Sequence, residues 1–257
     1  STLGNSSFFG TYLLFQIGFG FYLVLTERAK QRLLASIATL IFIVALLMTT
    51  AQAAKMAFVG GCILFPLLLL LSDQKSRAKR MAGIALLFSM ILSFLVLWLL
   101  LLQPGSSVHE WFVFRSGETR FVLWDIAWQG IMDQPIFGWG PENFQEVFQK
   151  YYNPCLGSPA CGGEIWFDRA HNKILDVLVE SGIMGLGFYL SLFLVAMANL
   201  CRAMRKTVIS RSVFALFSSL LLAYLVQNLT VFDTLVSTLL FILVLAFIAT
   251  IDSSSTV

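Results

Sequence analysis

The sequence has few charged residues. Only 12% of its 257 residues are Asp, Glu, Lys or Arg, whereas soluble domains average about 25%. The net charge of +3 is too small to indicate nucleic acid as a partner. The charges are absent from long apolar blocks and concentrated between them, which is typical of a multi-pass membrane protein and excludes an ordinary soluble domain.

Histidine and cysteine are also scarce. The two histidines and four cysteines show no zinc-site spacing, so the sequence predicts no zinc site, and we expect no cofactor. Cys155 and Cys161 flank a five-residue turn in a polar stretch, where an oxidising compartment would permit a disulfide, although two free thiols are the alternative. Cys62 and Cys201 lie in or beside apolar segments and are interpreted as packing residues.

Seven apolar blocks predict an all-α, polytopic membrane protein with about seven transmembrane helices. A span needs about 20 largely apolar residues, and about 17 are tolerated. The blocks cover residues 8–25, 33–48, 56–71, 81–102, 183–200, 213–226 and 235–251. We therefore divide the chain into four spans over 1–103, one large helical loop over 104–181 and three spans over 182–257.

Lysine and arginine cluster in the turns after the first, third and fifth blocks. These residues are Arg28, Lys30 and Arg32, then Lys75, Arg77, Lys79 and Arg80, then Arg202, Arg205, Lys206 and Arg211. All three turns fall on one side if every block spans, and basic residues mark the cytoplasmic side. The stretch 111–181 is then extracytoplasmic, and it is acidic on balance.

Apolar periodicity predicts three short helices in this outer stretch. The first covers 120–133, with Thr119 as its cap. Its apolar face is predicted to contain Phe121, Trp124, Trp128 and Ile131. The second covers 142–151, and the third begins near Asp168 and ends at Gly182, which suits a helix C-terminus.

The start of the third helix combines a base with anion-binding groups. His171 lies in its predicted first turn, where the positive helix end disfavours imidazolium and leaves a neutral ring that can accept a proton. Asp168 fits the N-cap, and Arg169 and Arg120 supply forked donors for phosphate or carboxylate. Backbone N–H groups at the helix start also favour an anion. These residues predict an anion site beside a general base.

A purely structural interpretation competes with this one. A histidine beside Asp and Arg at a helix start is often only part of a cap, and the residue chemistry alone favours that interpretation. Arg120 would then be an interfacial anchor or an ion-pair partner of Glu118 or Asp125.

Four sequence motifs carry a resemblance to a known family. They are Arg120-x-x-x-Trp124, Pro135-Ile136-Phe137-Gly138-Trp139-Gly140-Pro141-Glu142-Asn143-Phe144, Phe167-Asp168-Arg169-Ala170-His171-Asn172-Lys173-Ile174-Leu175-Asp176 and Glu180-Ser181-Gly182-Ile183-Met184-Gly185-Leu186. Together they resemble the O-antigen ligase and O-antigen polymerase family of bacterial envelope proteins. Family members usually carry several more helices before this region, so we expect the chain to be the C-terminal part of a larger fold.

The resemblance implies a reaction. Such proteins move a glycan from an undecaprenyl diphosphate carrier to lipid A-core, another glycan or a protein, at the outer face of the bacterial cytoplasmic (inner) membrane. No metal or nucleotide sugar takes part, and membrane helices hold the lipid tail. Carried over, Arg120 would bind the diphosphate, and His171 would be the general base on the acceptor hydroxyl or would bind the diphosphate in its neutral form. Arg169 would assist, and Asn172 would orient the histidine or the substrate. From its position beside them, Asp168 could also orient a neighbouring group.

One departure from the family pattern keeps other functions open. Gln52 stands where the family often has an outer-face arginine, and Lys55 is one helical turn later, where it would substitute as a point charge. A membrane transporter and a non-catalytic scaffold of a polysaccharide assembly system therefore remain as alternatives. The motifs do not separate a ligase from a polymerase.

Overall fold

A computed structural model describes residues 5–103, 105–107, 118–158, 161 and 163–253. The described residues form helices and connecting turns without any strand. The chain packs as two compact units. The first contains Ser1–Gly83 and Ser191–Val257, and the second contains Ile84–Leu190. The three-part division made from the sequence stays a prediction.

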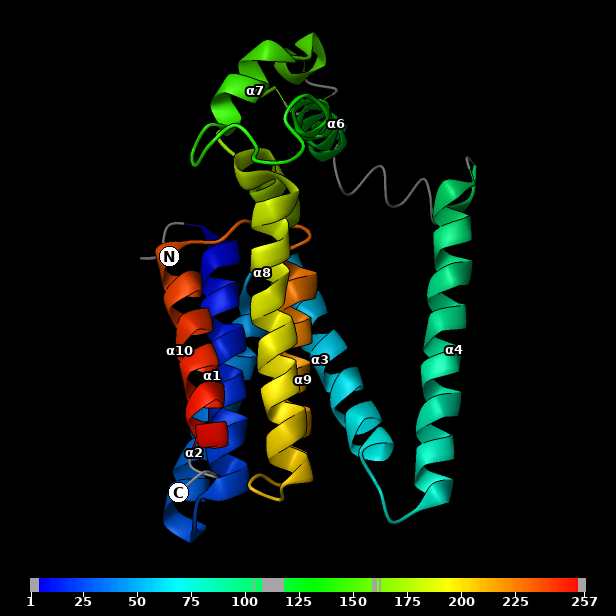
Figure 1. Ribbon diagram of the computed structural model, residues 1–257, viewed down its shortest axis with the longest axis vertical. Helices are drawn as coiled ribbons and strands as arrows, with labels where there is room; N and C mark the ends of the chain where they lie inside the picture. Colours follow the sequence, from blue (N-terminus) through cyan, green and yellow to red (C-terminus); the bar gives the residue numbers. More distant parts are fainter. Residues whose placement is uncertain (1–4, 104, 108–117, 159–160, 162, 254–257) are drawn as a thin grey trace. The chain divides into compact units, whose positions relative to one another are not determined.

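The first unit is a bundle of apolar helices. Its main members are α1 (Ser6–Thr26), α2 (Ala29–Met48), α3 (Gln52–Leu71), α9 (Arg211–Gln227) and α10 (Leu235–Ser253). Helix α1 contacts the other four, so it is the central element, and α3 also packs on α9 (Figure 1). A Cβ at Gly10 would lie 2.7 Å from the Cβ atoms of Ala51 and Ala54, so glycine permits the close approach of α1 to the start of α3.

Several helices are long and apolar enough to cross a membrane. Among the described residues they are α1, α2, α3, α4 (Arg77–Leu102) and α8 (Lys173–Arg205). Helices α9 and α10 are apolar but shorter. The predicted all-α, polytopic membrane fold is therefore confirmed, whereas the count of seven spans stays a prediction.

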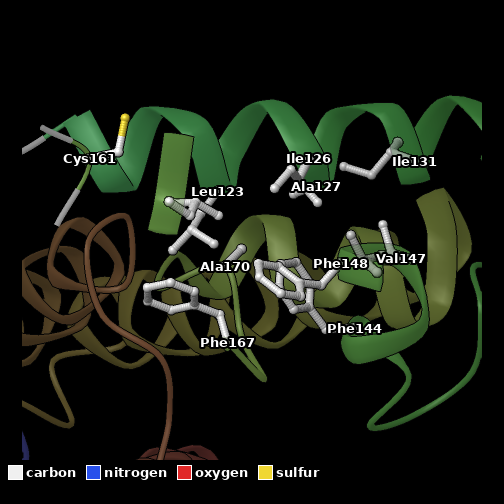
Figure 2. Close-up of a cluster of buried hydrophobic side chains, with 12 residues drawn as sticks. Leu123, Ile126, Ala127, Ile131, Phe144, Val147, Phe148, Cys161, Phe167 and Ala170 are labelled. Atoms are coloured by element: carbon white, nitrogen blue, oxygen red, sulfur yellow. The ribbon is translucent and has the colours of Figure 1, made fainter. Parts of the chain in front are cut away.

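The second unit has its own core outside the apolar spans. It contains α6 (Glu118–Asp133), α7 (Phe144–Lys150), the 3₁₀ turn η1 (Pro154–Gly157) and the first part of α8. Side chains from α6 face those of α7 and of the segment before α8 (Figure 2). The buried set includes Leu123, Ile126, Ala127, Ile131, Phe144, Val147, Phe148, Leu156, Phe167 and Ala170.

Three details of the outer helices differ from the predictions. Thr119 lies inside α6 and its hydroxyl donates to the Cys161 carbonyl, so it is not the helix cap. Helix α7 begins at Phe144 because Glu142 has a left-handed φ of 64°. Phe121 and Trp128 are exposed, since a neighbouring stripe of α6 faces the core instead.

Candidate active site

His171 lies in a short loop immediately before α8. The helix begins at Lys173, and the side-chain Oδ1 of Asn172 accepts hydrogen bonds from the backbone N–H groups of Ile174 and Leu175. Asn172 is therefore the N-cap, and the prediction that exposed Asp168 caps the helix was wrong. His171 has a φ of 55°, a left-handed conformation that is uncommon for any residue but glycine.

Two distant side chains hold the backbone next to His171. The indole Nε1–H of Trp124 donates to the Ala170 carbonyl at 3.1 Å, and the Ala170 N–H donates to Oδ1 of Asp176 at 2.7 Å. Ala170 and Asp176 are both buried. Helices α6 and α8 thus fix the loop from two sides, and these contacts maintain the unusual conformation of His171. Trp124 and Asp176 both lie in the sequence motifs, but no role in holding this loop was predicted for either of them.

The ring of His171 is arranged to act as a base. Its Nδ1 lies 3.2 Å from the Arg169 carbonyl oxygen, which can only accept, so Nδ1 carries the proton and Nε2 has the lone pair. The ring is half-buried and meets Phe167 edge-on, with 6.0 Å between ring centroids. Burial is the main cause that lowers the pKa of His171, and the charge of Arg120 lowers it further. The imidazole is therefore neutral at pH 7.

Arg120 supplies a positive charge near this base. It lies one helical turn before Trp124 on α6, on the face that reaches the His171 loop. The guanidinium is half-buried, and this burial lowers its pKa, although arginine still remains charged. Among the side chains that the structure describes, no carboxylate pairs with it. Of the two predicted partners, Asp125 accepts from Gln129 instead, and the side chain of Glu118 lies outside the described part. A buried cation of this kind favours an anionic ligand.

Arg169 is already engaged with carboxylates. Its Nη1 lies 2.8 Å from Oε1 of Glu180 on α8, and its Nη2 lies 2.5 Å from Oε2 of Glu142 in the turn before α7. The two ends of the guanidinium thus tie the His171 loop to two other segments. Arg169 holds the site together through two ion pairs, whereas Arg120 has no carboxylate partner among the side chains that the structure describes.

The turn 135–140 braces a break in α8 at Gly182, where φ is 61° and ψ is −163°. Backbone N–H groups of Trp139 and Gly140 donate to the carbonyls of Val179 and Glu180 before the break. The carbonyls of residues 135 and 136 accept from the N–H groups of residues 183 and 184 after it. The turn therefore supplies hydrogen-bond partners for the carbonyls before the break and for the N–H groups after it, which the broken helix leaves without helical partners.

Two glycines make this backbone contact possible. A Cβ at Gly182 would lie 2.2 Å from the Ile136 carbonyl oxygen, and a Cβ at Gly138 would lie 2.5 Å from the Ser181 nitrogen. Both glycines also have positive φ, which other residues adopt at a cost. The motifs over residues 135–144 and 180–186, which are separated in the sequence, thus form one structural element. This element places Glu180 against Arg169.

Comparison with known families agrees with these motifs. The sequence model of a family described as O-Antigen ligase matches residues 37–190, which is more than half of the chain. The chain belongs to the O-antigen ligase family. The matched region contains Arg120, the glycine-braced turn and His171. Membership indicates a polysaccharide-related function of the glycosyltransferase type. No curated protein sequence matches the chain.

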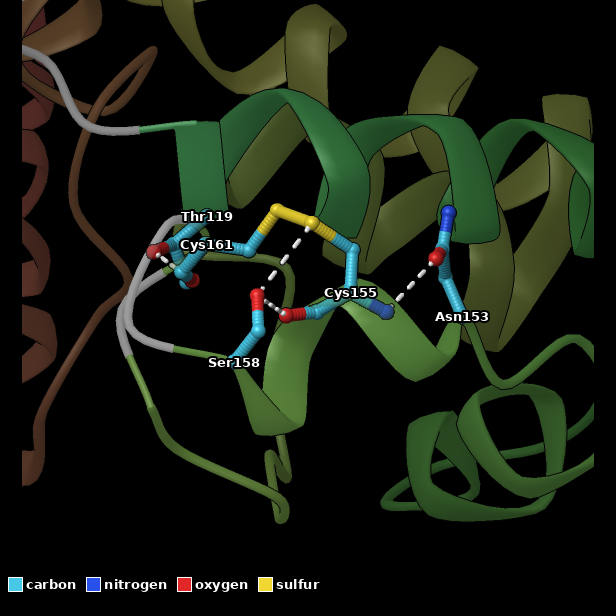
Figure 3. The surroundings of a disulfide bond; sticks show 5 residues. All are labelled: Thr119, Asn153, Cys155, Ser158 and Cys161. Atoms are coloured by element: carbon cyan, nitrogen blue, oxygen red, sulfur yellow. Dashed lines mark hydrogen bonds between the residues drawn. A yellow bond between two sulfur atoms is a disulfide. The ribbon is translucent and has the colours of Figure 1, made fainter.

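A disulfide closes a small loop in this O-antigen ligase family member (Figure 3). It joins Cys155 and Cys161, whose Cα atoms are 5.5 Å apart. The Cys161 carbonyl accepts the hydrogen bond from Thr119 at the start of α6. The loop is thus attached beside Arg120, the next residue of that helix.

The remaining predicted residues belong to the first unit. Gln52 and Lys55 lie in the first turn of α3, so Gln52 occupies the position where the resemblance leads us to expect an arginine. Arg120, Asp168, Arg169, His171 and Asn172 all belong to the second unit. No group of three or more His, Cys, Asp or Glu residues in the described part of the chain is arranged to hold a metal ion.

Proposed function

We propose that the protein transfers a glycan from an undecaprenyl diphosphate carrier to an acceptor hydroxyl at the outer face of the bacterial inner membrane. The observation that carries this proposal is the combination of Arg120 and His171. Arg120 is a half-buried cation with no carboxylate partner among the described side chains, and it lies one helical turn before Trp124, which is hydrogen-bonded to the loop that carries the neutral His171 imidazole. A cation stabilises the diphosphate leaving group, and a neutral imidazole takes the proton of the acceptor hydroxyl.

In the proposed reaction, Nε2 of His171 takes the proton of the acceptor hydroxyl as its oxygen attacks the anomeric carbon. A new glycosidic C–O bond forms, and the bond between the sugar and the diphosphate breaks. The diphosphate leaves with the electron pair, and the Arg120 guanidinium stabilises the negative charge that develops on it. The neutral state of His171 at pH 7 is the state that can accept the proton.

The other predicted residues have supporting roles in this proposal. Arg169 assists by holding the His171 loop through Glu142 and Glu180. Asn172 fixes the start of α8, and exposed Asp168 is available to orient substrate. We propose that Lys55 contributes a point charge towards the diphosphate in place of an arginine at position 52.

The test is transfer in vitro with the full chain in bilayers, an undecaprenyl diphosphate-linked glycan and candidate acceptors. Arg120→Ala should lower the rate about 10²- to 10³-fold, the effect of removing one group that stabilises an oxyanion. Arg120→Lys should recover only part of it, because lysine lacks the fork geometry. Lys150→Gln is the matched control, since Lys150 is an exposed cation of the same unit that pairs with Asp133.

The products separate the remaining candidates. One glycan block on lipid A-core identifies a ligase, and a ladder of lengthening lipid-linked glycan identifies a polymerase. Equal rates for wild type and Arg120→Ala would contradict the proposed role of Arg120. No transfer to lipid A-core, glycan or protein acceptors would favour the transporter or scaffold alternatives.

A further inference from the structure

The turn after α6 carries two large apolar side chains that the site does not use. Ile136 and Phe137 are exposed, and Phe137 has 76% of its surface accessible. Met132 and Trp128, one and two helical turns earlier on α6, are exposed on a common stripe of that helix. Isolated exposed apolar residues are ordinary, but a contiguous group of this size marks an interaction surface.

Backbone hydrogen bonds fix the position of this turn along α8. The N–H of Ile183 donates to the Pro135 carbonyl at 2.8 Å, and the N–H of Met184 donates to the Ile136 carbonyl at 3.3 Å. The side chains of Ile183 and Met184 are themselves exposed. The turn and the first residues after the Gly182 break therefore lie side by side, and their exposed apolar side chains occur at the same level of the helix.

That level is where the apolar part of α8 begins. At about 1.5 Å per residue, the 33 residues of α8 extend about 50 Å, more than the roughly 30 Å of a hydrocarbon core. The polar residues Lys173, Asp176 and Glu180 precede the break, and the apolar block 183–200 follows it. The long apolar block lies after the break, so we place the bilayer boundary at the break.

Within this unit, α6 runs across the direction of α8. Figure 1 shows α6 nearly end-on, whereas α8 is seen from the side. A helix that lies across a membrane-spanning helix at the bilayer boundary runs along the membrane surface. Tryptophan and other large apolar side chains are favoured in that interfacial layer.

We propose that Ile136 and Phe137, with Met132 one turn before them, insert into the interfacial layer of the bilayer that α8 crosses. The occupant of this surface is lipid, because the surface is continuous with the apolar surface of the span. The anchor sets the height of the second unit above the membrane. At this height the His171 loop meets a diphosphate headgroup at the membrane surface. This last step rests on the proposed function.

Site-directed nitroxides test the anchor without any need for activity. Phe137→Cys, Met132→Cys and Gln149→Cys are made in a Cys62→Ser, Cys201→Ser chain that keeps the Cys155–Cys161 disulfide. Each labelled protein is placed in phosphatidylethanolamine–phosphatidylglycerol bilayers, and its relaxation by oxygen is compared with its relaxation by a water-soluble nickel complex. Gln149 is the control because it is exposed on α7, on the side away from the apolar core.

At positions 137 and 132 oxygen should relax the label more than the nickel complex does, whereas the order should be reversed at position 149. The proposal would be overturned if the label at position 137 or at position 132 were relaxed more by the nickel complex than by oxygen, as is expected at position 149. In the transfer assay, Phe137→Asp should lower the rate at least tenfold and Phe137→Leu less than twofold. Failure of transfer by the wild type would contradict the proposed function and leave the nitroxide result to decide the anchor.

Discussion

The two units are stabilised in different ways. The first packs apolar helix faces, and small residues such as Gly10, Ala51 and Ala54 let its helices approach closely. The second depends on directional contacts between segments that are distant in the sequence, such as Trp124 with Ala170 and Arg169 with Glu142. Apolar packing tolerates many substitutions, whereas each directional contact depends on one pair of groups. The site is therefore more sensitive to single substitutions than the bundle.

The largest expected effect is that of Gly182→Ala. Its Cβ would meet the Ile136 carbonyl oxygen at 2.2 Å, and the positive φ adds strain. We expect a cost of at least about 2 kcal/mol in the second unit, with transfer almost abolished. Limited proteolysis should then cut the outer segments while the first unit remains resistant.

Gly187→Ala is the matched control on the same helix. Nothing lies within 4 Å of a Cβ at that position, so the variant should behave as wild type. If Gly182→Ala were as active and as resistant as Gly187→Ala, the bracing role of the turn 135–140 would be refuted.

Removal of the disulfide should have the next largest effect. Cys155→Ser with Cys161→Ser opens a loop of seven residues, which costs roughly 2 kcal/mol in the chain-entropy model. Thermal unfolding followed by proteolysis at residues 118–158 should shift to lower temperature, whereas the bundle transition should stay unchanged. The same shift in both transitions would show that the two units do not unfold separately.

The two ion pairs of Arg169 should contribute different amounts to the free energy of unfolding. The Glu142 side chain is 76% exposed and that of Glu180 is 13% exposed. Glu142→Gln should therefore cost less than about 1 kcal/mol, as exposed ion pairs do. Glu180→Gln should cost more, because it leaves the half-buried guanidinium with a weaker partner. Urea unfolding of the two variants measures this order, and a reversed order would contradict the assigned geometry.

The smallest expected effect is that of mild acid. Because burial lowers the pKa of His171 below its ordinary 6.5, more than half of the rings stay neutral at pH 6.5. The transfer rate should then change less than about twofold between pH 7.5 and 6.5, and should fall only at lower pH. The unfolded chain takes up this proton more readily, so the contribution of His171 itself to the stability of the second unit should be lost as the pH falls below about 6.5. A rate that already falls steeply above pH 6.5 would contradict a buried, neutral His171.

The helices of the bundle could be predicted from the sequence for a physical reason. In lipid, every backbone group must be satisfied within the segment, so an apolar run of sufficient length has to be a helix. The predicted blocks 33–48 and 56–71 accordingly lie within α2, Ala29–Met48, and α3, Gln52–Leu71. Both blocks end where the helices end, at Met48 and Leu71, but they begin a few residues late because each helix starts with residues that precede its apolar part.

The outer unit was harder to predict because local patterns there have more than one solution. Helix α6 has two apolar stripes, and periodicity alone does not say that Leu123 and Ile126 face the core while Trp128 is exposed. Both Asp168 and Asn172 can cap a helix, and the bond from Ala170 to Asp176 excludes the earlier start. The motifs indicated His171 and Arg120, but their spacing in the sequence does not show that the Trp124–Ala170 hydrogen bond and a shared apolar core bring the two segments together.

The most direct test of catalysis by the second unit is the transfer rate of His171→Ala in bilayers, relative to wild type and to Gln149→Ala. We expect a loss of about 10²- to 10⁴-fold for His171→Ala, the usual contribution of a general base, and no change for Gln149→Ala. The protein should remain in the membrane with its Cys155–Cys161 disulfide intact. Transfer by His171→Ala at the wild-type rate would contradict the assignment of the catalytic base to the loop before α8.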